Sequence, residues 1–273
     1  MKKHVLNVII IMLLLVSFAV FVTAVFPNNT VIQEAPPTNK EERLVYLQDL
    51  VAAIQKGIDN RQQKIDIRAF NCDAETLKEA MTLVSFSNPL YSFYTERYGA
   101  VFSMRGTVKY VKIVYNADNK ITYVTDEVTN IVATMEPSLS ELEKVIWINN
   151  YICTTYTYDD SMVYNDAFAM LSYKKGACGA YTQLFSLLAD EAGLNVTFAI
   201  SFSMQHVWNL VQVDGQWYNI DVTWDDWPNY AYCYLTSDEL MLDFHEYRRS
   251  PEDTIQFVQC TDTRYDKVLL TRE

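Results

Sequence analysis

Residues 176–181 read Gly176-Ala177-Cys178-Gly179-Ala180-Tyr181, which places a cysteine among small residues at the head of a long apolar stretch. After the cysteine, four apolar residues recur at helical spacing: Leu184, Phe185, Leu187 and Leu188. Gly193 then ends the pattern. We therefore predict a helix from about Cys178 to Ala192. A helix N-terminus stabilises a thiolate, although a cysteine in such a position is more often a buried structural residue. A functional role for Cys178 therefore depends on its partners.

The sequence after this helix predicts an antiparallel hairpin that supplies such partners. Three β-rich stretches follow one another along the chain: 195–202, 206–213 and 216–223. Asp214-Gly215 is typical of a two-residue turn between the last two stretches. That turn places Trp208 opposite Asp221. His206 then lies opposite Thr223, and its side chain shares one face of the sheet with that of Asp221. A loop of odd length would instead put these two side chains on opposite faces.

Cys178, His206 and Asp221 together form the predicted catalytic site. His206 would accept the proton of Cys178 through one ring nitrogen, and Asp221 would fix the tautomer through the other. Taken alone, His206 is more often a satisfied core residue and Asp221 a strand-end acid. Their conjunction with Cys178 is what favours a thiol enzyme. The backbone N–H of Cys178 is the expected oxyanion donor, and the sequence leaves three candidates for a second donor: Tyr156, Tyr158 and Gln205.

Three blocks of sequence also carry a family resemblance: Gly176-Ala177-Cys178-Gly179-Ala180-Tyr181, His206-Val207-Trp208-Asn209 and Trp217-Tyr218-Asn219-Ile220-Asp221-Val222-Thr223-Trp224. In this order they resemble the signature blocks of bacterial transglutaminase-like proteins. The resemblance extends to three other segments: Tyr158-Asp159, Asn165 and Tyr234-Leu235-Thr236-Ser237-Asp238. It therefore covers about residues 138–245. The chain departs from the family pattern at Ala180, where relatives usually have glycine. We expect this methyl group to narrow the site beside Cys178.

The resemblance implies an α+β fold with a papain-like or transglutaminase-like core. In such a core, the helix that bears Cys178 packs on an antiparallel sheet that carries His206 and Asp221. The resemblance implies no cofactor, and it implies an acyl-thioester formed at Cys178 from an amide. We expect a cysteine peptidase or amidase whose substrate is a peptide, a protein or a cell-wall amide. The family also contains protein-glutamine acyltransferases and non-catalytic binding modules, and the sequence leaves both alternatives open.

Two tryptophans lie on the predicted face of the catalytic residues. Trp208 and Trp217 are candidates for the walls of a substrate cleft, but aromatic packing accounts for them equally well. Water is the default acceptor for an unshielded acyl-enzyme. Because no lysine-docking feature is recognisable in the sequence, we favour hydrolysis over transfer to an amine.

The N-terminus is typical of a targeting segment. Met1-Lys2-Lys3-His4 precedes a mostly apolar run from Val5 to Phe26, which fits either a cleaved signal peptide or an N-terminal membrane anchor. The two lysines favour the cytoplasmic side for the N-terminus. We therefore expect the rest of the chain to be exported, either secreted or anchored at the outer face of the cell membrane.

The remainder of the chain divides by composition and pattern. We predict a linker over 27–39, an appended α+β region over 40–135, and the transglutaminase-like catalytic domain over 136–273. Ser138 and Glu141 form a capping-box pattern that predicts the start of the first catalytic-domain helix. The segment before Met135 remains ambiguous between strand and helix.

Charge and cysteine content limit the function classes. The chain has 22 Lys and Arg against 34 Asp and Glu, a net charge of -12, so we expect no nucleic-acid partner. We expect membrane contact only through the N-terminal segment. The chain has five cysteines: Cys72, Cys153, Cys178, Cys233 and Cys260. Their spacing resembles neither a disulfide framework nor a metal site, so we also expect no metal.

Overall fold

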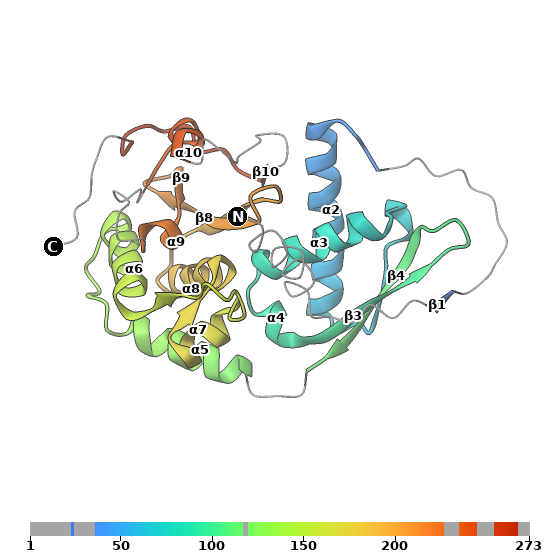
Figure 1. The fold of residues 1–273 in the computed structure, drawn as a ribbon, viewed down its shortest axis with the longest axis horizontal. Coiled ribbons are helices and arrows are strands. Elements are labelled where there is room, and N and C mark those ends of the chain that lie inside the picture. The colour runs from blue at the N-terminus through green and yellow to red at the C-terminus, as the bar shows by residue number, and fades with distance from the viewer. Residues whose placement is uncertain (1–22, 25–35, 117–119, 227–234, 245–253, 267–273) are drawn as a thin grey trace. The chain divides into compact units, whose positions relative to one another are not determined.

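The computed structural model describes residues 23–24, 36–116, 120–226, 235–244 and 254–266. They form two compact units, Met1–Asp118 and Asn119–Glu273 (Figure 1). Most of the predicted targeting segment lies outside the described residues. Within the part of the chain that the structure describes, no helix has both the length and the apolar character needed to cross a membrane.

The first unit combines helices with a small sheet. Its elements are β1 (Thr23–Ala24), α2 (Lys40–Asp59), β2 (Lys64–Asp66), the 3-10 helix η1 (Arg68–Phe70), α3 (Ala74–Ser87), α4 (Tyr91–Tyr94), β3 (Thr95–Phe102) and β4 (Val108–Tyr115). The strands are ordered β1-β3-β4-β2, and β3 pairs antiparallel with β4. Helix α2 begins after Asn39, whose side chain accepts hydrogen bonds from the backbone N–H groups of Glu41 and Glu42. Helix α2 also packs against α3.

The second unit contains the predicted catalytic residues. Its elements are α5 (Lys120–Val132), α6 (Glu141–Thr155), β5 (Thr157–Tyr158), α7 (Ala167–Tyr173), β6 (Lys175–Gly176), α8 (Cys178–Glu191), β7 (Val196–Ser201), β8 (His206–Val213), β9 (Gln216–Ile220), α9 (Val222–Asp225), α10 (Asp238–Phe244) and β10 (Thr254–Gln256). The main sheet has the antiparallel order β10-β7-β8-β9, and β5 pairs parallel with β6.

The division between the units differs from the boundary expected at residue 135. The structure places α5 in the second unit, where it packs against α7 and α8. Val124, Val128 and Ile131 form the buried stripe of this helix. That stripe has helical spacing, and it resolves the ambiguity of the segment before Met135.

The predicted register of the hairpin is confirmed. Val213 pairs with Gln216, and the ladder continues to the pair of Asn209 and Ile220. The turn residues Asp214 and Gly215 have φ angles of 51° and 78°, which a two-residue turn with both central residues at positive φ requires.

The predicted extension of the last strand to 223 is wrong. Strand β9 ends at Ile220 because Asp221 caps the short helix α9, and its side chain accepts a hydrogen bond from the backbone N–H of Trp224. The two predicted pairs beyond Ile220 are therefore not formed: Asp221 does not pair with Trp208, and Thr223 lies in a helix and does not pair with His206.

The start of α6 also differs from the prediction. Ser140 is the N-cap residue, and Glu143 closes the capping box with it. The sequence contains the capping-box spacing twice in succession, at Ser138 with Glu141 and again at Ser140 with Glu143. The pattern alone does not choose between them, and the structure uses the second.

Helix α8 packs on the antiparallel sheet through polar as well as apolar contacts. The Thr182 hydroxyl donates to the backbone oxygen of Val207 at 3.0 Å. The Asn209 side-chain amide donates to the Thr182 carbonyl at 3.2 Å and to the Ser186 hydroxyl at 2.8 Å. Figure 1 shows α8 beside β8. The predicted fold class, an α+β papain-like core with the cysteine helix on an antiparallel sheet, is confirmed.

Candidate active site

Cys178 is the first residue of α8 and is partly exposed. Its Sγ lies 4.0 Å from the backbone oxygen of Gln205, the residue before β8. The first N–H groups of a helix have no partner within the helix. Among the described residues, none accepts a hydrogen bond from the N–H of Cys178, so this group is available to a ligand at the thiol.

Asn165 caps α8 from a neighbouring loop. The N-cap residue Ala177 has no capping side chain, and the Asn165 Oδ1 accepts the N–H of Gly179 at 2.9 Å instead. A Cβ atom on Gly179 would lie 2.7 Å from that Oδ1, which is closer than real Cβ contacts. A larger residue after Cys178 would therefore push the Asn165 amide away and disturb its hydrogen bond to the start of α8.

Asp159 organises the loop that carries Asn165. Its buried carboxylate accepts hydrogen bonds from the Ser161 hydroxyl at 2.7 Å and from the backbone N–H groups of Val163 and Tyr164 at 3.0 and 3.1 Å. Burial opposes the charge of Asp159, but these hydrogen bonds and Lys175 outweigh it and lower its pKa. The Tyr164 carbonyl in turn accepts the N–H of Ala177 at 2.7 Å. The ordered loop thus fixes the position of the residue before Cys178.

His206 and Asp221 form a buried pair beside the thiol. The His206 Nε2 lies 2.6 Å from the Asp221 Oδ2, and the two residues are 9% and 2% exposed. Burial disfavours the charged imidazole, but the charge and hydrogen bond of Asp221 and the hydrogen bond of His206 with Cys178 outweigh burial. Together they raise the pKa of His206 to about 10. His206 is therefore an imidazolium at neutral pH, and Nδ1 is the ring nitrogen left for Cys178.

Two tryptophans hold the imidazole in place. The ring of His206 stacks on Trp208, with centroids 5.8 Å apart and planes 21° apart. The ring of Trp224 lies 6.2 Å away on α9. Gln205, directly before His206, has a φ of 53°, which is uncommon for a residue other than glycine. The imidazole thus contacts two tryptophan rings, and the residue before it has an unusual backbone conformation.

Of the two interpretations of Trp208, its burial favours aromatic packing over a cleft wall. Trp208 is only 1% exposed, and its Nε1 donates to the Asn219 Oδ1 at 2.8 Å. It belongs to a core cluster on the sheet with Ala199, Leu210, Met241 and Cys260, and Trp217 packs against this cluster from the edge. This face of the sheet is covered by α10 and the segment that contains Cys260, which the strand pattern alone did not reveal.

The expected effect of Ala180 on the site is not supported. Ala180 is fully buried, and its Cβ lies beneath Gly176, where an added Cβ would come within 2.5 Å of it. The methyl group therefore fills the contact between α8 and β6 and does not line the space beside the thiol.

The other described cysteines differ from Cys178 in their burial. Cys72, Cys153 and Cys260 are buried. Burial, with a smaller contribution from Asp73, raises the pKa of Cys72 to about 11. Cys233 lies outside the described residues. Among the described residues, no group of three or more His, Cys, Asp or Glu side chains is arranged to hold a metal ion.

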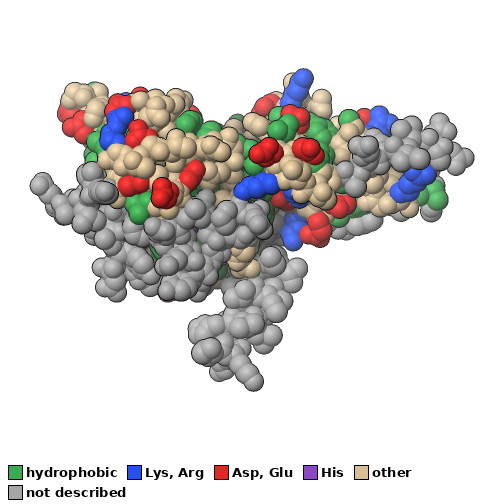
Figure 2. Space-filling model, turned by 90° about the horizontal axis from the view of Figure 1, so that it is seen from above, with side chains coloured by type: hydrophobic (Ala, Val, Ile, Leu, Met, Phe, Trp, Pro, Cys, Tyr) green, Lys and Arg blue, Asp and Glu red, His purple; other side chains and the backbone are tan. Residues whose placement is uncertain are grey.

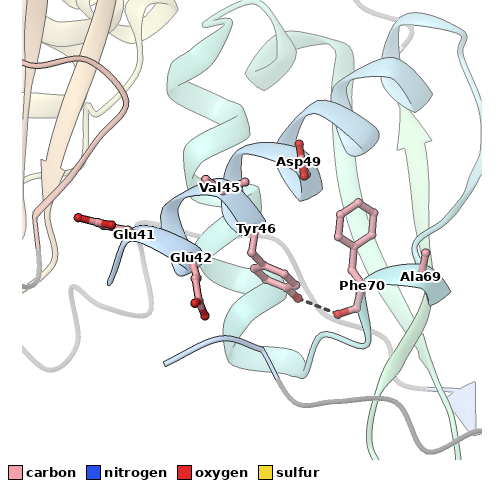
Figure 3. A pocket seen from close by; sticks show the side chains of 7 residues that line it. All are labelled: Glu41, Glu42, Val45, Tyr46, Asp49, Ala69 and Phe70. Atoms are coloured by element: carbon pink, nitrogen blue, oxygen red, sulfur yellow. Dashed lines mark hydrogen bonds between the residues drawn. The ribbon is translucent and has the colours of Figure 1, made fainter. Parts of the chain in front are cut away.

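A separate pocket lies on the first unit, between α2 and η1 (Figure 3). It has a volume of about 530 Å³, and its lining residues are Glu41, Glu42, Val45, Tyr46, Asp49, Ala69 and Phe70. The Tyr46 hydroxyl donates to the backbone oxygen of Phe70 at 3.1 Å. No thiol or imidazole lines this pocket. The predicted catalytic residues lie elsewhere, in the second unit: Cys178 at the start of α8, His206 at the start of β8 and Asp221 before α9.

The second unit therefore combines a papain-like core with a thiol, an imidazole and a carboxylate in contact. Residues 128–222 match the family model of the transglutaminase-like superfamily. This segment belongs to that superfamily, and all three predicted site residues lie within it. None of the curated proteins matches the chain significantly.

Similarity to solved structures is distant. A provisionally named cysteine protease from Cytophaga hutchinsonii is 14% identical, with a TM-score of 0.31, and the match covers 43% of this chain and 51% of that one. A protein named as a TGase is 16% identical over 52% of this chain and 48% of that one, with a TM-score of 0.35. A provisionally named protease from Parabacteroides distasonis is 14% identical over 44% and 32%, with a TM-score of 0.30. The chain thus spans about half the length of the first two structures and about a third of the third.

Proposed function

We propose that this protein is an exported cysteine peptidase or amidase that forms an acyl-thioester at Cys178. The single observation that carries the proposal is the buried pair of His206 and Asp221, 2.6 Å apart, with the imidazole against a partly exposed thiol at a helix N-terminus. A base with an orienting acid beside a nucleophile is the arrangement that thiol acyl transfer requires.

The reaction would proceed in two halves. The Cys178 thiolate attacks the carbonyl carbon of the amide, and the N–H of Cys178 donates a hydrogen bond to the oxyanion. The C–N bond then breaks while the His206 imidazolium gives its proton to the leaving amine. In the second half, neutral His206 takes a proton from water as the hydroxide attacks the thioester, and the thiolate leaves as the carboxylic acid is released.

Hydrolysis is preferred over transfer to an amine because of the position of Trp208. A tryptophan wall around the thioester would exclude water and favour an amine acceptor, but Trp208 is buried in the core instead of lining a cleft. Protein-glutamine acyl transfer remains the alternative reaction at the same residues.

The chemistry of the proposed site supports amide-bearing substrates. A peptide, a protein or a cell-wall amide each supplies the carbonyl that the thiolate attacks. On the face drawn in Figure 2, acidic and basic side chains are interspersed, and the basic ones form no continuous patch among the described residues. Together with the net charge of -12, this favours substrates other than nucleic acids.

The proposed reaction is tested with a library of amide-bearing peptides, supplied with and without a labelled primary amine. We expect free acid to form, and we expect an acyl adduct at Cys178 that mass spectrometry detects and that Cys178→Ala lacks. Faster incorporation of the amine than release of the acid would replace the hydrolase with an acyltransferase. Absence of both products, with Cys178 unreactive, would favour a non-catalytic binding module.

A further inference from the structure

An oxyanion at Cys178 requires more than the one donor described so far. Enzymes of this chemical type stabilise the tetrahedral intermediate with preorganised donors, and removal of one of these costs roughly 10²–10³ in rate. The backbone N–H of Cys178 is one such donor. We propose that the hydroxyl of Tyr158 is the second donor to the oxyanion, a role that rests on the function proposed above.

Strand pairing fixes Tyr158 beside the nucleophile. Strand β5 pairs parallel with β6, which puts Tyr158 in register with Gly176, two residues before Cys178. The next N–H, that of Asp159, donates to the Gly176 carbonyl at 2.9 Å. The pairing of β5 with β6 therefore fixes the backbone of Tyr158. The buried Asp159 carboxylate holds the loop that follows through its hydrogen bonds with Val163 and Tyr164.

The ring of Tyr158 lies against the face of α8 that carries the thiol. Its centroid is 6.4 Å from that of Tyr181, and Tyr181 follows Cys178 by three residues in the helix. Residues three apart share one side of a helix. Tyr181 is itself fixed, because its hydroxyl donates to the Asp226 Oδ2 at 2.5 Å. The Tyr158 ring thus packs against Tyr181, a side chain that is held in place near the first turn of α8.

The hydroxyl of Tyr158 is suited to donate. Tyr158 is half-buried, and no described residue forms a hydrogen bond with its hydroxyl. Burial raises its pKa, and so do the nearby negative charges of Cys178, Asp160, Asp159 and Asp221. The hydroxyl therefore keeps its proton at every pH at which the enzyme would work.

The two other candidates fit less well. Tyr156 is 2% exposed and its hydroxyl is fully enclosed, with its ring packed edge-on against Tyr151 at 6.2 Å. Gln205 contacts Cys178 through its backbone carbonyl, which accepts hydrogen bonds but does not donate them, so only its side-chain amide could serve as a donor.

Two probes separate oxyanion stabilisation from activation of the thiol. Acylation of Cys178 by p-nitrophenyl acetate passes through an oxyanion, whereas alkylation by iodoacetamide does not. We expect Tyr158→Phe to slow acylation by about 10²-fold and to leave the alkylation rate unchanged. Tyr156→Phe is the matched control, because it removes an enclosed hydroxyl two residues away, and it should behave like the wild type in both reactions.

The outcomes distinguish this inference from the proposed function. An equal fall in acylation and alkylation for Tyr158→Phe, or no fall in acylation, would overturn the role of Tyr158 alone. A wild-type thiol that is alkylated but never acylated would overturn the proposed function and this role with it. If Tyr158→Phe fails to fold, 3-fluorotyrosine at position 158 keeps the ring and the hydroxyl. Because fluorine makes the phenol a stronger hydrogen-bond donor, the acylation rate of this variant should rise at pH values where the phenol keeps its proton, with the alkylation rate unchanged. An acylation rate that does not rise in folded protein would exclude the role.

Discussion

The imidazole of His206 and the carboxylate of Asp221 lie 2.6 Å apart although the two residues come from different elements. His206 opens β8, and Asp221 follows β9 and caps α9. The hairpin turn at Asp214 and Gly215 sets the register that brings them together. Changes in either residue should therefore have effects on charge, reactivity and stability that can be separated by experiment.

Asp221→Asn should lower the pKa of His206. The carboxylate is the main group that raises this pKa to about 10, and without it burial favours the neutral ring. We expect the pKa to fall below its ordinary value of 6.5, and we expect acylation of Cys178 to slow by roughly 10²–10⁴-fold. Titration of the imidazole signals by NMR measures the first effect. An unchanged His206 titration would show that Asp221 does not control the ring.

Folding stability should fall as the pH rises from about 6.5 to about 10. Folding raises the pKa of His206, so protonation favours the folded state. This contribution is complete below the unfolded value of 6.5 and is lost as the pH rises through the folded value of about 10. Denaturant titrations of the wild type across this window measure the decline. Asp221→Asn is the control, since it should make the curve flatter, and parallel curves for the two proteins would contradict the assignment.

Cys178 should be the thiol that iodoacetamide labels fastest in the native protein. It is partly exposed and in contact with the imidazolium, whereas Cys72, Cys153 and Cys260 are buried. Peptide mapping after a short pulse identifies the labelled site, and labelling in denaturant provides the reference for the buried thiols. His206→Ala should slow the labelling of Cys178 at neutral pH. Equal rates with and without His206 would rule out activation by the imidazole.

Gly179→Ala should destabilise the second unit, and Asn165→Ala should partly rescue it. The added methyl group would lie 2.7 Å from the Asn165 Oδ1, and truncation of Asn165 removes that clash. Asn165→Ala alone should cost about 1 kcal/mol because it leaves the start of α8 uncapped. Thermal unfolding of the four proteins in a double-mutant cycle gives the coupling. Additive effects would mean that the two residues do not meet.

Export is tested on intact cells of the native host. The Lys2-Lys3 start and the apolar run to Phe26 lead us to expect the second unit at the outer face or in the medium. External protease should therefore remove a surface-anchored form without lysis, and a secreted form should appear in the medium. A cytoplasmic protein serves as the lysis control. Protection of the cell-associated protein until lysis, with none in the medium, would reverse the expected localisation.

Local patterns predicted much of the second unit. The apolar spacing after Cys178 and the stop at Gly193 gave the bounds of α8 within a residue, because helix signals act over one turn. The Asp214-Gly215 turn gave the register from Val213 to Asn209, because side chains alternate strictly along paired strands. The shared face of His206 and Asp221 followed from that register without any knowledge of the surrounding packing.

The missed features depend on contacts between distant segments. The cap from Asn165 to Gly179 joins a loop to the start of α8 through one amide oxygen, and no periodic pattern marks such a contact. Trp208 was placed on the correct face of the sheet, but α10 and the segment around Cys260 cover that face. The early end of β9 was missed because Asp221 serves both as a continuation of the strand pattern and as a helix cap.

Asp221 binds His206 through one carboxylate oxygen and caps α9 through the other. A relative that had lost its chemistry but kept its shape would therefore still be under selection to retain this aspartate. An acid at this position is thus a poor marker of activity among homologues. Loss of the cysteine or the histidine should come first when such a protein drifts towards a purely binding role, and those two positions are the ones by which active and inactive members can be sorted.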